Sequence, residues 1–146
     1  MKRFAILMMV ALASLMLLSC RKDSPIFSPV GKVWVSDNNH EAYDLATKKG
    51  VIYFFNITSV AEKIAAAEEV STSEANGWSE YTIEHDAISK KYSIVAESGA
   101  TLVFDMESLN EAYLKLLKTD SGEQIGNIIH VRSVKANIKY EKPLDL

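Results

Sequence analysis

Apolar side chains in this 146-residue chain recur at every second position over short runs, and clusters of turn-forming residues separate these runs. A β-strand points successive side chains to opposite faces of its sheet, so the pattern predicts strands with one buried face. The clearest runs are residues 32–36, 51–57, 78–85, 91–96, 101–106 and 128–134. Several short strands spaced in this way predict a small antiparallel meander that forms a barrel or a sandwich.

Two segments leave the choice between helix and strand open. Residues 61–70 have a helix-forming composition, whereas a continuous meander would require a strand there. In residues 108–118, Ser108 and Glu111 fit a helix capping box, but the same segment can form a strand with Leu114 and Leu116 facing inward. We prefer the strand for 108–118, and the mainly β fold leaves room for one or two short helices.

The N-terminus has the pattern of a secretory signal. Lys2 and Arg3 precede an apolar run from Phe4 to Leu18, interrupted by the small polar Ser14. A helix needs roughly 20 apolar residues to cross a bilayer, and this run is too short for a permanent span. We therefore expect a signal helix that is removed during export.

The end of that run, Leu17-Leu18-Ser19-Cys20, resembles the bacterial lipobox. The resemblance implies that lipid is attached to Cys20 and that cleavage falls between Ser19 and Cys20, so that residues 1–19 are the signal peptide. The lipid would place the chain in a membrane of the cell envelope. Arg21, not Asp, follows the cysteine, which under the enteric sorting rule favours the outer membrane.

Composition defines the rest of the organisation. Cys20 is the single cysteine, so the body has no disulfide and must depend on its hydrophobic core. The formal net charge is −3, and the chain has no basic stripe that would indicate nucleic acid binding. Prolines, serines and charges predict a flexible tether over residues 20–30, and residues 31–138 form one domain. The segment 139–146 contains Pro143 and is predicted to be a loosely held tail.

The body resembles small lipocalin-like lipoprotein domains of Gram-negative bacteria. The motifs that carry this resemblance are Gly31-Lys32-Val33-Trp34, the aromatic run 53–59, Tyr81-Thr82-Ile83 and Leu102-Val103-Phe104. The resemblance covers residues 31–134 and implies a small β-barrel. The helix-like segments depart from the pattern and leave open whether the barrel closes.

The sequence contains no recognisable catalytic motif, and we expect no enzyme. His40, His85 and His130 are not clustered with the residues that a metal site requires, so neither a metal nor a cofactor is predicted. Aromatic residues could line a ligand cavity, or they could fill the core of a small barrel. The candidate cavity-lining residues are Trp34, Tyr53, Phe55, Tyr81, Tyr92 and Phe104.

These features predict a lipid-anchored, non-enzymatic protein of the cell envelope. Its β domain would bind a small apolar ligand or an envelope partner. The alternative is a structural or protein-interaction module, such as an inhibitor or accessory subunit, with a filled core and no ligand.

Overall fold

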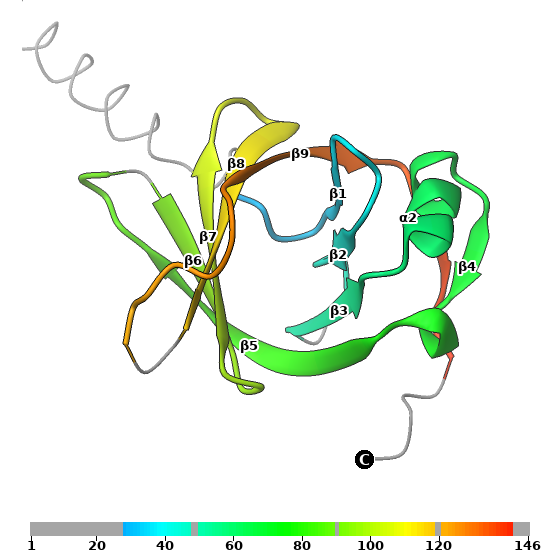
Figure 1. Cartoon of the computed structure of the whole chain (residues 1–146), viewed down its shortest axis with the longest axis horizontal. Coiled ribbons are helices and arrows are strands. Elements are labelled where there is room, and N and C mark those ends of the chain that lie inside the picture. Colours follow the sequence, from blue (N-terminus) through cyan, green and yellow to red (C-terminus); the bar gives the residue numbers. More distant parts are fainter. Residues whose placement is uncertain (1–27, 48–49, 90, 119–120, 142–146) are drawn as a thin grey trace, which may run out of the picture.

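The computed structural model describes residues 28–47, 50–89, 91–118 and 121–141. The predicted signal peptide, Cys20 and most of the tether lie outside these residues. The described chain forms a closed barrel of eight antiparallel strands (Figure 1). They are β1 (Val33–Ser36), β2 (Ala42–Asp44), β3 (Val51–Phe55), β5 (Gly77–His85), β6 (Lys91–Ala96), β7 (Ala100–Met106), β8 (Glu111–Lys118) and β9 (Ile129–Val134). The predicted mainly β fold is confirmed, and it is a barrel, not a sandwich.

Each barrel strand pairs with its neighbours around the ring, and β9 pairs with β1 to close it. The registers place alternate residues of every strand inside the barrel, as the sequence pattern predicts. In the β6–β7 pair, for example, Tyr92 lies opposite Phe104 and Ile94 opposite Leu102, and all four are buried in the inner core.

The ambiguous segment 61–70 is helix in its first half, to Ala65, and strand at its end, from Glu69. Helix α2 (Thr58–Ala65) buries Val60, Ala61 and Ile64, and strand β4 (Glu69–Ser71) and a short 3₁₀ turn (Thr72–Glu74) follow it. This excursion leaves the barrel after β3 and returns as β5, so it does not interrupt the ring of strands.

The other ambiguous segment is strand β8, as preferred from the sequence. Leu114 is buried in the inner core and Leu116 packs against it. The amide of Ser108 donates to the carbonyl of Glu111 in the turn between β7 and β8, where a helix cap had been the alternative.

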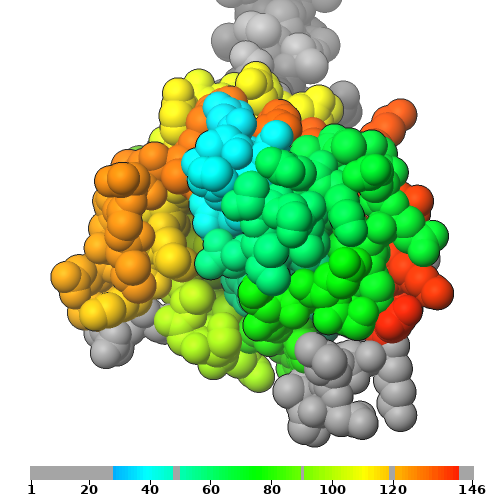
Figure 2. All heavy atoms as spheres, turned by 45° about the vertical axis from the view of Figure 1, so that its right-hand side comes forward, coloured from blue at the N-terminus to red at the C-terminus, as the bar shows by residue number. Residues whose placement is uncertain are grey.

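A second hydrophobic cluster covers the outer face of β1, β2 and β3. Helix α2, β4 and strand β10 (Asn137–Lys139), which pairs parallel with β4, pack on this face. In Figure 2 the C-terminal residues, coloured red, lie beside the green atoms of the excursion. Strand β3 is therefore covered on both sides, with Ile52 inside the barrel and Tyr53 under the outer layer.

The prediction of a loose tail over 139–146 is wrong for its first residues. Lys139 belongs to β10, the Tyr140 hydroxyl donates to Asp44 Oδ2 at 2.6 Å, and the Glu141 amide donates to Thr72 Oγ1 at 2.9 Å. Asp44 is fully buried, so its carboxylate requires such a partner. Burial raises the pKa of Asp44, although the hydrogen bond from Tyr140 opposes the rise.

The predicted tether also extends too far along the chain. Pro29 is buried, and its carbonyl accepts the indole N–H of Trp34 at 2.9 Å. Val30 packs against the inner core. Residues 29 and 30 therefore belong to the domain and cover one end of the barrel, which we call the closed end.

Candidate functional site

The inner core is tightly packed toward the closed end. The rings of Trp34 and Phe104 meet there at a centroid distance of 5.5 Å, and both side chains are 0% exposed. Their burial with Tyr92 and Ile94 leaves this half of the barrel filled by its own side chains.

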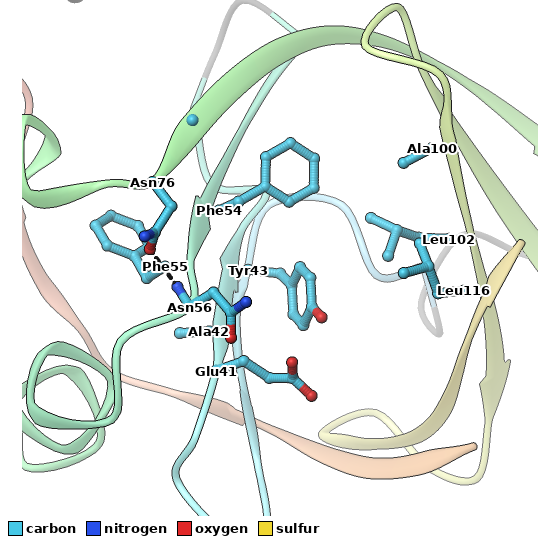
Figure 3. Close-up of a pocket in the computed structure, with 11 residues that line it drawn as sticks. Glu41, Ala42, Tyr43, Phe54, Phe55, Asn56, Asn76, Ala100, Leu102 and Leu116 are labelled. Carbon is cyan, nitrogen blue, oxygen red and sulfur yellow. Dashed lines mark hydrogen bonds between the residues drawn. The ribbon is translucent and has the colours of Figure 1, made fainter. Parts of the chain in front are cut away.

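The opposite end of the barrel is hollow. We call this end the mouth; it is formed where β2, β5 and β7 begin and where β3 and β8 end. A cavity of about 340 Å³ lies there. Figure 3 shows Tyr43 and Phe54 on one wall and Leu102 and Leu116 on the opposite wall. These four side chains give the mouth an apolar interior.

A second hollow of about 270 Å³ continues from the first and shares Glu41, Tyr43 and Leu116 with it. The loop between β8 and β9 borders this second hollow. Two isoleucines of that loop, Ile125 and Ile128, are 40% and 54% exposed. The apolar surface of the mouth therefore extends outward onto the loop.

Four side chains that border the mouth cavity carry polar groups: Glu41, Tyr43, Asn56 and Asn76. The side-chain oxygen of Asn76 accepts a hydrogen bond from the backbone amide of Asn56 (Figure 3). Burial raises the pKa of Tyr43, and the neighbouring charge of Glu41 raises it further. The hydroxyl of Tyr43 therefore stays protonated and is a donor at neutral pH.

Four of the six predicted cavity-lining residues belong to the inner core. Trp34, Tyr92 and Phe104 are buried in the packed half of the barrel, and Tyr81 is half-buried against the same cluster. None of these four borders the mouth cavity.

The remaining two, Tyr53 and Phe55, lie on the outer face of β3 in the cluster under α2. Phe55 also borders the edge of the mouth cavity. The mouth instead contains the rings of Tyr43 and Phe54, which were not predicted to line it. Their centroids are 6.1 Å apart. Alternation identifies the two faces of β3, but both faces are apolar, so sequence alone did not show which one faces inward.

A polar cluster on the outer wall contains His130 and Arg132. His130 Nδ1 lies 2.7 Å from Asp37 Oδ2, and its Nε2 lies 3.6 Å from Glu111 Oε1. Arg132 joins the same cluster by donating to Asn39 Oδ1. Both nitrogens of His130 are directed to carboxylates, so the cluster ties the β1–β2 turn to β8 and β9.

Within the described ranges, no group of three or more His, Cys, Asp and Glu residues is arranged to hold a metal ion. The same part of the chain has no helix that is long and apolar enough to span a membrane.

In comparisons with known protein families, curated proteins and solved structures, nothing matches this chain. Within the described residues, the mouth is the strongest candidate site.

Proposed function

We propose that this chain is a lipid-anchored, non-enzymatic protein of the bacterial cell envelope and that the mouth of its barrel binds a small apolar ligand. The observation that carries the proposal is the hollow between Tyr43, Phe54, Leu102 and Leu116, next to a core that is otherwise filled. Its volume of about 340 Å³ is near the lower end of the range for ligand pockets, so the ligand is small.

The described chain enters the domain at the closed end of the barrel, opposite the mouth. Lipid on Cys20 would connect through the tether to Ser28, and residues 29 and 30 pack on the closed end. The mouth would then face away from the membrane, which we propose is the outer membrane. A ligand would enter from the aqueous side and not directly from the bilayer.

Calorimetric titration of octanol into the full chain tests ligand binding. The chain is held in nanodiscs of zwitterionic lipid. The reference is Ala100→Trp, whose added ring fills the mouth, since Ala100 lies on the cavity wall (Figure 3). Both proteins are titrated in the same lipid, so the difference between their heats measures binding of octanol in the cavity.

We expect saturable binding that Ala100→Trp abolishes. The matched control Ala87→Trp adds the same side chain at the exposed β5–β6 turn and should bind octanol as the unmodified chain does. Equal heats for the unmodified chain and Ala100→Trp would refute the ligand proposal. That result would favour the interaction module, with the exposed Ile125 and Ile128 as part of its contact surface.

The anchor has a separate test. Cys20→Ala should remove incorporation of labelled fatty acid and should leave an uncleaved or released protein. Cys20→Ser is the conservative control, because it keeps the size of the side chain but has no thiol. Normal maturation and membrane fractionation of Cys20→Ala would contradict the anchor.

A further inference from the structure

The charge at the mouth has one sign. The residues that line the two hollows are apolar side chains, Tyr43 with its hydroxyl, glycines, amides and one charged group, the carboxylate of Glu41. No lysine, arginine or histidine is among these lining residues of the described chain. A ligand head group at the mouth would therefore meet a carboxylate and hydrogen-bonding amides.

Glu41 is placed where such a head group would lie. It precedes β2 and is half-buried, and Figure 3 shows its carboxylate near Tyr43 at the edge of the cavity. Burial and the neighbouring charge of Glu41 both raise the pKa of Tyr43. A carboxylate has about four acceptor positions, which a donor group on a ligand could occupy.

The basic groups near the mouth have other partners. Lys118 lies opposite Ala100 in the β7–β8 pair, but its Nζ is 3.9 Å from Glu123 Oε2. The ring of His40, which adjoins Glu41 in sequence, contacts Thr58 Oγ1 at 3.2 Å through Nδ1. Neither side chain lines the hollows, so neither supplies a counter-charge inside the mouth.

We infer that the mouth selects a small apolar compound with an ammonium-type cationic head and discriminates against carboxylates such as short fatty acids. This inference rests on the proposed ligand-binding function of the same site. An ammonium group would donate to Glu41 while its chain lies between Phe54 and Leu102. A carboxylate in that place would be repelled by Glu41 and would lose water without gaining a charged partner.

Three ligands with the same eight-carbon chain separate the effects of chain and head. Octanol, octylammonium and octanoate are titrated at neutral pH into the full chain in zwitterionic nanodiscs, each referenced to Ala100→Trp. We expect octylammonium to bind about fivefold to tenfold more tightly than octanoate, the size expected for a partly exposed charge contact. Glu41→Gln should remove this preference between the two charged ligands. Glu84→Gln, an exposed carboxylate change on β5 outside the mouth, should keep it.

The outcomes distinguish the two proposals. If octanol shows no saturable binding relative to Ala100→Trp, the ligand-binding function itself fails. If octanol binds but octanoate binds as well as octylammonium, the function stands and the charge selection is overturned. Persistence of the preference in Glu41→Gln would also overturn it, because the selection would then have another source.

Discussion

The two ends of the barrel are built from the same strands but differ in what fills them. At the closed end, Trp34 and Phe104 meet in the centre and Val30 packs against the same inner core. At the mouth, Ala100 and Gly77 stand where strands begin, and these small residues leave the space between the walls unfilled. Alternation of apolar residues thus produces a closed sheet, whereas the sizes of the inward residues determine whether its interior is filled.

Because of this difference, we expect substitutions at the two ends to have different effects on stability and on binding. A packed interior stabilises the fold through buried area and close contact, so changes there act mainly on the free energy of unfolding. Side chains that border a hollow have no packing contacts on the side that faces it. Substitutions at the mouth should therefore alter binding more than stability.

The largest expected effect is at the closed end. Trp34→Ala should lower the free energy of unfolding by about 3–5 kcal/mol, because it creates a cavity in a fully buried site. Leu116→Ala at the mouth should cost clearly less, since Leu116 already borders a hollow. Urea unfolding followed by circular dichroism measures both. A loss below about 1 kcal/mol for Trp34→Ala would mean that the closed end is not the packed half of the barrel.

A smaller loss of stability is expected when only the hydrogen bond between Trp34 and the Pro29 carbonyl is removed. Trp34→Phe keeps an aromatic ring but leaves the Pro29 carbonyl without its donor, which should cost about 1–3 kcal/mol. Trp78→Phe is the matched control, because the buried Trp78 Nε1 has no hydrogen-bond partner among the described residues. The same unfolding measurement should show a larger loss for Trp34→Phe. Equal losses would argue that ring size alone, not the contact with Pro29, accounts for the change.

The sequence predicts the barrel well because strand pairing depends on local alternation. It also correctly favours a strand within 108–118, where Leu114 and Leu116 face inward; the strand itself is Glu111–Lys118. The secondary structure of residues 61–70 was harder to predict. A helix can form there only because the chain leaves the barrel between β3 and β5. That choice is made by the outer faces of β1 to β3, whose apolar side chains require a cover.

The candidate site was less predictable for a physical reason. Tyr53 and Phe55 are on one face of β3 and Ile52 and Phe54 on the other, and both faces are buried. When both faces are apolar, alternation cannot tell the inside of a barrel from a covered outside. Tyr140 was missed in a similar way, because the partner that orders it, Asp44, is distant in sequence.

The smallest expected effect on stability comes from filling the mouth. Ala100→Trp places a large ring toward open space, so it should change the free energy of unfolding by less than about 1 kcal/mol, whereas overpacking a filled core costs about 1–3 kcal/mol. The equivalent enlargement at the packed end is Ala112→Trp, because Ala112 is fully buried in the inner core. Urea unfolding of the two variants compares the ends directly. A loss for Ala100→Trp as large as for Ala112→Trp would show that the mouth is as tightly filled as the closed end, and no room would remain for a ligand.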